Sequence, residues 1–72
     1  MSDLDTRLLK AHETRDHWSL VALYQEAADR TADEDAQYFY LTHAYIFSLE
    51  LNHPDQTALR ARLIAGGRET PQ

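Results

Sequence analysis

Apolar residues recur at helical spacing along most of the chain. Leu4, Leu8 and Ala11 lie four and three residues apart, which is the spacing of one face of an α-helix. A second stripe at the same kind of spacing consists of Leu20, Leu23, Tyr24 and Ala27. No stretch alternates apolar and polar residues over the length of a strand. The pattern therefore predicts an all-α protein.

Residues that favour helix N-termini divide the first half of the chain. Ser2 or Asp3 can cap a first helix, and Asp16 can cap a second helix that begins directly after it. Thr31, with Glu34 three residues later, has the spacing of a capping box. These signals predict three helix starts before residue 40.

The second half of the chain has its own boundaries. A third helix is predicted over about 33–51, with Asn52 as a left-handed cap at its end. Pro54 suits the first position of a fourth helix, which the glycines at 66–67 would end. Residues 67–72 are expected to form a frayed tail.

The length of 72 residues predicts one helical domain, close to the lower limit for a single hydrophobic core. Connections of about two to five residues favour antiparallel neighbouring helices. We therefore expect four antiparallel helices as two hairpins, over 1–30 and 31–66 of a domain that spans 1–72.

The third predicted helix is apolar on nearly every side. Its segment YFYLTHAYIFSLEL, residues 38–51, has ten apolar or aromatic residues among fourteen and five of the seven aromatic residues of the chain. One interpretation is a central helix that touches the second and fourth helices on different sides. The other is that one of its faces binds a partner.

Charge and composition exclude several classes of function. The net charge is −5, and residues 31–59 contain five acids and no Lys or Arg, so nucleic acid is a poor candidate partner. No cysteine is available for disulfides or thiolate metal sites. The sequence shows no signal peptide and no apolar run long enough for a membrane span, so we expect a cytoplasmic protein.

A shift of 34 residues carries the apolar positions of the first helix onto Tyr38, Thr42 and Tyr45. With Leu41, these residues read Y-x2-L-T-x2-Y, which resembles the first-helix signature of a tetratricopeptide repeat. The positions that resemble the second-helix signature are Leu20, Tyr24 and Ala27. The resemblance covers nearly the whole chain, as two degenerate repeats.

The chain departs from that family's pattern in several places. Leu4 stands where an aromatic residue is usual, Ala11 stands where a tyrosine is usual, and both turn glycines are missing. A plain four-helix bundle therefore remains the alternative architecture.

In tetratricopeptide proteins, the first helix of each hairpin lines a groove that holds a partner segment. The varieties that bind a C-terminal carboxylate use Lys and Asn there, whereas this chain has Asp5 among its groove positions, so that ligand class is contradicted. The resemblance implies a groove suited to the apolar stripe of an amphipathic helix or to a second copy of the chain. Its predicted partner-binding residues are Leu9, His12, Phe39, His43, Ile46 and Phe47.

Two repeat units leave an apolar face that a third unit would normally cover. We therefore expect a homodimer, or another protein bound at this face. The alternative function is that of a structural or regulatory subunit that uses the same face for homodimerisation.

An enzymatic function is not expected. The chain has no nucleophile elbow, no phosphate-binding glycine loop and no cysteine nucleophile, and it implies no cofactor. A metal site is not expected either. Glu13 and His17 are predicted to lie on either side of a break between two helices, so they would not share a helix face, and Glu50-x-x-His53 is only half of a di-iron motif. His53 is expected to be a cap or an exposed side chain. His43 is expected in a core or an interface, where its burial would make association pH-dependent.

Overall fold

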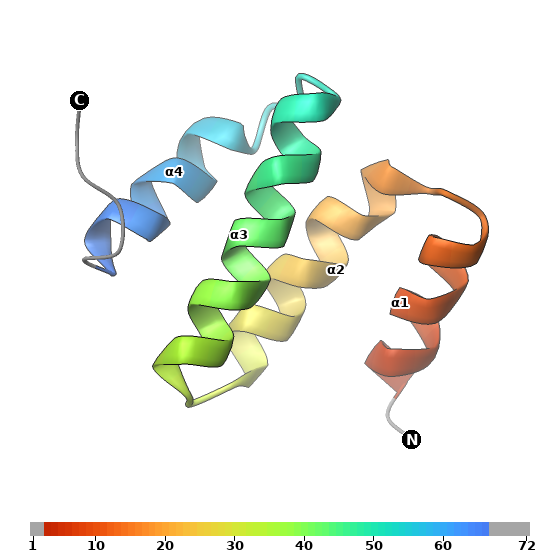
Figure 1. Ribbon diagram of the computed structural model, residues 1–72, viewed down its shortest axis with the longest axis horizontal. Helices are drawn as coiled ribbons and strands as arrows, with labels where there is room; N and C mark the ends of the chain where they lie inside the picture. Colours follow the sequence, from red (N-terminus) through yellow and green to blue (C-terminus); the bar gives the residue numbers. More distant parts are fainter. Residues whose placement is uncertain (1–2, 67–72) are drawn as a thin grey trace.

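The computed structural model describes residues 3–66, which form four α-helices and no strand. They are α1 (Asp3–Glu13), α2 (His17–Arg30), α3 (Glu34–Glu50) and α4 (Gln56–Ala65), joined by short connections (Figure 1). The predicted all-α class is confirmed. The predicted cap at Ser2 and the predicted tail at 67–72 lie outside the described residues.

The cap of α2 follows the prediction, whereas the cap of α3 does not. The Asp16 carboxylate accepts hydrogen bonds from the Ser19 backbone N–H at 3.2 Å and from its hydroxyl at 2.6 Å. At α3, Asp33 is the N-cap and accepts from the backbone N–H groups of Asp35 and Ala36. The prediction of a capping box at Thr31 was therefore wrong. The Thr31 hydroxyl instead accepts from the Asp33 N–H at 3.2 Å, in the turn before the helix.

The connection between α3 and α4 is a tight turn. Asn52 has φ of 52°, which confirms the predicted left-handed cap. Pro54 lies in the turn, and α4 begins only at Gln56 after the N-cap Asp55, so the predicted start at Pro54 was two residues early. The reason is local: His53 Nδ1 accepts the Asp55 N–H at 3.0 Å, which holds these residues in a turn.

The helices pack mainly on their neighbours in the chain. Helices α2 and α3 run in opposite directions, since His17 at the start of α2 lies beside Glu50, and Gln37 near the start of α3 bonds the Ala28 carbonyl. Helix α1 flanks α2 and α4 flanks α3 (Figure 1). Within residues 3–66, no Cα of α1 lies within 8 Å of α3. The result is a flat molecule, with extents of 35 × 28 × 13 Å.

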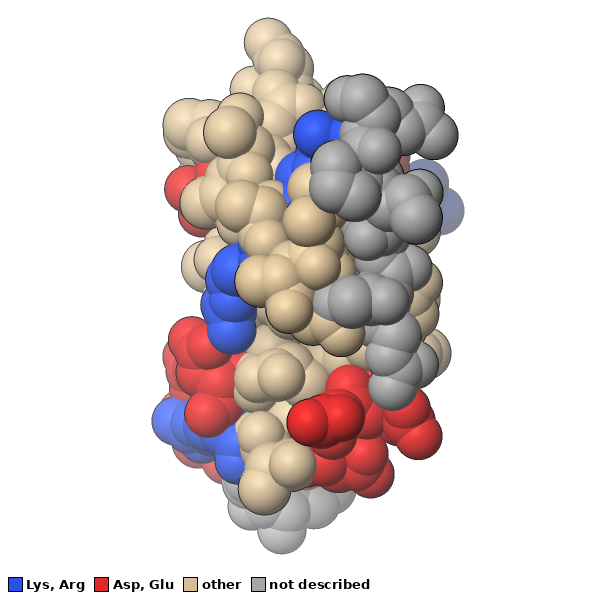
Figure 2. Space-filling model, turned by 90° about the vertical axis from the view of Figure 1, so that its left-hand side faces the viewer, with Lys and Arg blue, Asp and Glu red and all other residues tan. Residues whose placement is uncertain are grey.

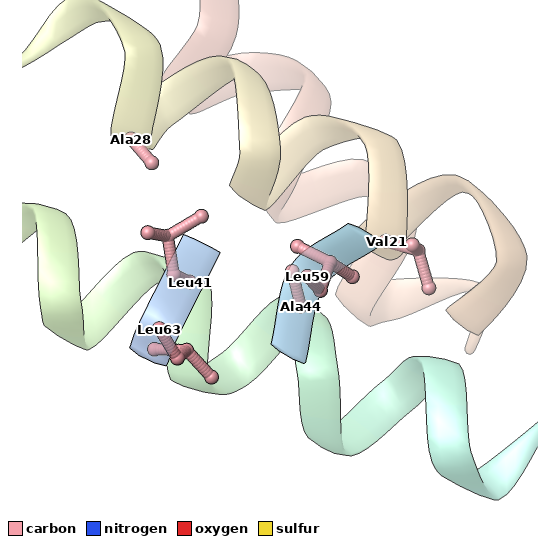
Figure 3. Packing of buried hydrophobic residues seen from close by; sticks show 6 residues of the cluster. All are labelled: Val21, Ala28, Leu41, Ala44, Leu59 and Leu63. Carbon is pink, nitrogen blue, oxygen red and sulfur yellow. The ribbon is translucent and has the colours of Figure 1, made fainter. Parts of the chain in front are cut away.

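Two clusters of buried side chains hold the four helices together, and α2 contributes to both. Figure 3 shows the first cluster, which joins α2, α3 and α4 through Val21, Ala28, Leu41, Ala44, Leu59 and Leu63. The second cluster joins α1 to α2 through Leu4, Ala11, Leu20, Leu23 and Ala27. The helix between the two clusters is therefore α2. Helix α3 contacts both α2 and α4, as the interpretation of a central third helix expects, but its Phe39, Ile46 and Leu49 keep at least half of their surface exposed.

Polar contacts tie both outer helices to α2. The Arg7 guanidinium of α1 donates two hydrogen bonds to the Glu26 carboxylate, at 2.6 and 3.1 Å. On the other side, Arg62 of α4 donates to Asp29 at 2.7 Å. Each outer helix is therefore joined to α2 by a charged contact as well as by a core cluster.

Candidate functional site

A tyrosine of α2 organises the face that the sequence singled out. The Tyr24 ring stacks on the His43 ring at 5.2 Å between centroids and on the Phe47 ring at 6.2 Å. The Tyr24 ring also meets the His12 ring edge-on, at 5.8 Å between centroids. Side chains from α1, α2 and α3 therefore meet in one cluster of rings, with α2 supplying the central member.

A hydrogen bond fixes this cluster at the α1 side. His12 Nε2 and the Tyr24 hydroxyl are 2.8 Å apart, with donor and acceptor set by the His12 tautomer. Partial burial, helped by the neighbouring Tyr40, raises the pKa of Tyr24 above its ordinary value of 10.0. Tyr24 therefore stays a neutral phenol at physiological pH, and its O–H remains available to His12.

Phe47 links the ring cluster to the core. Its side chain is half-buried and packs against both core clusters. Its ring lies 4.9 Å from the His17 ring and 6.3 Å from the His12 ring. His17 in turn places Nδ1 3.4 Å from a Glu50 carboxylate oxygen, which joins the start of α2 to the end of α3. Much of the Phe47 surface is thus used within the chain.

The other predicted partner-binding residues are more open. Phe39, Ile46 and Leu9 keep 55%, 52% and 55% of their surface exposed. The Phe39 ring lies against the edge of the half-buried His43 ring at 4.4 Å, so Phe39 extends the cluster outward along α3. His12 is exposed apart from its contacts with Tyr24 and Phe47. Leu9 lies one turn before His12 on α1.

Three relevant residues were not among the predicted site residues. Tyr24 was assigned only to an apolar stripe, although it is the centre of the cluster. Leu49 is 50% exposed and lies three residues after Ile46, so the helical spacing of the sequence already places the two close together on α3. Trp18 is 56% exposed, and its ring lies 4.2 Å from the His53 ring.

The histidines outside the cluster have structural partners. His53 is buried, with 7% of its surface exposed, so the expectation of an exposed side chain was wrong. It is not a helix cap either, since Leu51 is the C-cap of α3 and Asp55 is the N-cap of α4, but its Nδ1 accepts the Asp55 N–H in the turn between them. Glu13 ends α1 and His17 begins α2, with a turn between them.

Within residues 3–66, no three His, Asp or Glu side chains form a group that could hold a metal ion. None of the helices in this range is long and apolar enough to cross a membrane.

The chain matches no protein family model, no curated protein and no solved structure. The resemblance to tetratricopeptide repeats therefore rests on its own spacing of residues and stays a prediction.

Proposed function

We propose that this protein is an interaction module that binds an amphipathic or apolar segment of another protein. The binding surface is the face on α1 and α3 defined by the six predicted residues, hereafter the partner face. The observation that carries the proposal is the exposure of Phe39 and Ile46, each by more than half, beside an ordered ring cluster. No cofactor takes part, and the proposed location is the cytoplasm.

The energetics of binding favour such a face. Large side chains that leave water on binding supply most of the affinity, and aromatic residues are prominent among them. Phe39 contacts the ring of His43, and His43 stacks on Tyr24, so the ring against which Phe39 lies is itself positioned by α2. The proposal is also consistent with the resemblance to tetratricopeptide hairpins, whose first helices line the binding groove.

A second candidate function uses the same face. The protein would be a structural or regulatory subunit that forms a homodimer through α3. The observation in its favour is the number of large apolar side chains left half-exposed on so small a domain. They are Leu9, Trp18, Phe39, Ile46 and Leu49.

The test compares a face variant with a matched control. Phe39→Asp places a charge on the partner face, and Ala22→Asp places the same charge on an exposed position of α2 outside it. Proteins captured from the source cell by the wild type are purified, and their dissociation constants are measured with all three forms. We expect Phe39→Asp to weaken binding by about tenfold or more, and Ala22→Asp to leave it unchanged.

Solution mass by light scattering separates the two candidates. A wild-type monomer that loses its partner in Phe39→Asp supports the interaction module. A wild-type dimer that Phe39→Asp splits into folded monomers supports the structural subunit. Equal partner affinity for Phe39→Asp and the wild type, with an unchanged mass, would show that the partner face is not the binding surface.

A further inference from the structure

The outward side of α3 carries one straight row of residues. Phe39, Thr42, Ile46 and Leu49 follow each other at intervals of three, four and three residues, so they lie along one side of the helix. We call this row the α3 seam. Three of its members are at least half-exposed, and the fourth, Thr42, uses its hydroxyl to donate to the Tyr38 carbonyl at 2.7 Å. The seam is therefore apolar and offers no hydroxyl proton of its own.

The side of α3 opposite the seam is committed to the core. Leu41, Ala44 and Ser48 are buried, and the Ser48 hydroxyl donates to the Tyr45 carbonyl at 2.6 Å. Helices α2 and α4 both contact α3, whereas α1 has no Cα within 8 Å of it in the described chain. The seam thus lies on the side that the described helices leave open.

The seam has acidic ends. Asp35 lies one turn before Phe39, and Glu50 directly follows Leu49. Between residues 31 and 59 the chain has no Lys or Arg. Of the α4 arginines, Arg62 bonds Asp29 of α2, and Arg60 lines a shallow hollow with Tyr45. Figure 2 shows, from the α4 side, acidic side chains gathered in the lower part of the molecule, where the α2–α3 connection lies in Figure 1.

These charges argue against a second copy as the occupant. If two α3 helices paired in opposite directions about Thr42, Asp35 of one copy would lie level with the Leu49–Glu50 pair of the other. If they paired in the same direction, Asp35 would meet Asp35 and Glu50 would meet Glu50. Both arrangements bring like charges together at both ends of the seam, which costs free energy and disfavours self-association.

We infer that the occupant of the α3 seam is an amphipathic helix of another protein with Lys or Arg at both ends of its apolar stripe. The inference rests on the proposed function and names its partner class. The seam spans eleven residues from Phe39 to Leu49, about 15 Å of helix, which is long enough for a stripe of about 10 Å with anchors at i, i+3 or i+4, and i+7. Basic residues beyond each anchor would then lie near Asp35 and Glu50.

A displayed library of 16-residue helix-forming peptides tests the inference. The library is selected against the wild-type protein, and the selected sequences are read. We expect apolar residues at helical spacing with an excess of Lys and Arg outside them. Selected peptides should bind Ile46→Glu about tenfold or more weakly, while Ala22→Glu on the exposed side of α2 keeps the wild-type affinity.

A second selection isolates the contribution of charge. The double variant Asp35→Asn, Glu50→Gln keeps the apolar seam and removes both acidic ends. Peptides selected against it should retain the apolar spacing and lose the excess of Lys and Arg. Peptides from the first selection should bind the double variant about three- to tenfold more weakly, with a smaller dependence on salt.

The outcomes separate the inference from the proposed function. Selected peptides that depend on the seam but have no excess of Lys and Arg would overturn the inference of a basic partner helix. The proposed function as an interaction module would still be supported. A wild-type dimer in light scattering that Ile46→Glu splits would make a second copy the occupant and support the structural subunit. If no selected peptide depends on Phe39 or Ile46 and the wild type is monomeric, both the inference and the proposed function fail.

Discussion

Two phenylalanines on the same helix have different environments. Phe39 is more than half exposed and contacts only neighbouring rings of α3 among the ring contacts of residues 3–66. Phe47 is half-buried and reaches rings of α1 and α2 as well as both core clusters. Eight residues of spacing place them on sides of α3 that differ by about 80° at the helical step of 100° per residue. Phe47 is therefore a packing residue of the fold, and Phe39 is a surface residue.

Replacing each phenylalanine by aspartate tests that division. Phe47→Asp should lower the free energy of unfolding by about 2–4 kcal/mol, because it removes packing in the core and leaves a poorly solvated charge. Phe39→Asp should lower it by less than about 1 kcal/mol. Urea unfolding followed by circular dichroism measures both. Equal losses in the two variants would contradict the assignment of Phe47 to the core and Phe39 to the surface.

A carboxylate in the α1–α2 cross-link makes stability depend on pH. The hydrogen bonds from Arg7 hold the pKa of Glu26 below its ordinary value of 4.5, with further help from the charges of Arg7 and Arg30. Because this pKa is lower in the folded state than in the unfolded state, the ionised carboxylate stabilises the fold. This contribution is complete at pH values above the pKa of the unfolded state and is lost as the pH falls through the pKa of the folded state. The cross-link should therefore weaken below about pH 4.5.

The melting temperature of Glu26→Gln checks this expectation. The variant should melt below the wild type at pH 7, and the two should converge as the pH falls toward about 3. Arg7→Gln should show the same convergence, because it removes the other half of the same hydrogen-bonded pair. A constant difference between Glu26→Gln and the wild type over this range would show that Glu26 acts through packing rather than charge.

At the scale of the helices, the turn between α3 and α4 depends on one backbone conformation. Asn52 is left-handed at φ of 52°, and its side-chain carbonyl accepts a hydrogen bond from the Gln56 amide at 3.0 Å. Its backbone N–H donates to the Leu49 carbonyl at 3.2 Å. The turn that follows brings His53 into its buried position against Trp18.

Two substitutions at Asn52 should separate backbone strain from side-chain contact. Asn52→Val should lower the free energy of unfolding by about 1–2 kcal/mol, because a β-branched residue tolerates the left-handed region poorly. Asn52→Gly should change it by less than about 1 kcal/mol, since glycine accepts that conformation freely. Thermal unfolding of both variants provides the measurement. Similar losses in both would indicate that the bond to Gln56 matters more than the backbone.

The helix starts show how far the sequence could be interpreted alone. Asp16 was predicted correctly because it is followed by an apolar stripe at helical spacing, with Ser19 three residues on. Thr31 and Asp33 are both good capping residues two positions apart, and local preference does not choose between them. Asp33 is the cap because the Thr31 hydroxyl already accepts a hydrogen bond from the Asp33 N–H in the preceding turn.

The candidate site shows a different limit. The six predicted residues came from a repeat pattern that places positions on a helix face but does not say which face meets α2. Because α3 is apolar on nearly every side, its sequence pattern does not separate Phe47, which meets the core, from Ile46, which is open. The central role of Tyr24 depends on α1 and α3 both meeting α2, which is a property of the tertiary fold.

At the scale of the whole molecule, stability should be unevenly distributed. Helix α2 contributes to both core clusters, and α3 packs against it through the first of them. Helices α1 and α4 each cover one side of this pair. Outer elements with fewer buried contacts open at lower free energy than the centre they cover.

Native-state hydrogen exchange should therefore show a fixed order of protection. Backbone amides in the middle of α2 and α3 should exchange most slowly, and those of α1 and α4 faster. The Arg7→Gln variant should speed exchange in α1 with little effect on α4, because the lost contact joins α1 to α2 alone. Equal protection of all four helices would indicate that the domain opens only as one unit.

The two sides of α3 place different demands on evolution. Leu41, Ala44 and Ser48 hold the fold, and Phe39, Ile46 and Leu49 lie on the open side of the same helix. Under the proposed function, descendants of this gene would exchange the second set to follow a changing partner while the first set stays constant. One helix would then carry two rates of sequence divergence, at positions only one or two residues apart, and an alignment of orthologues would test the proposed binding surface by its covariation with a second gene.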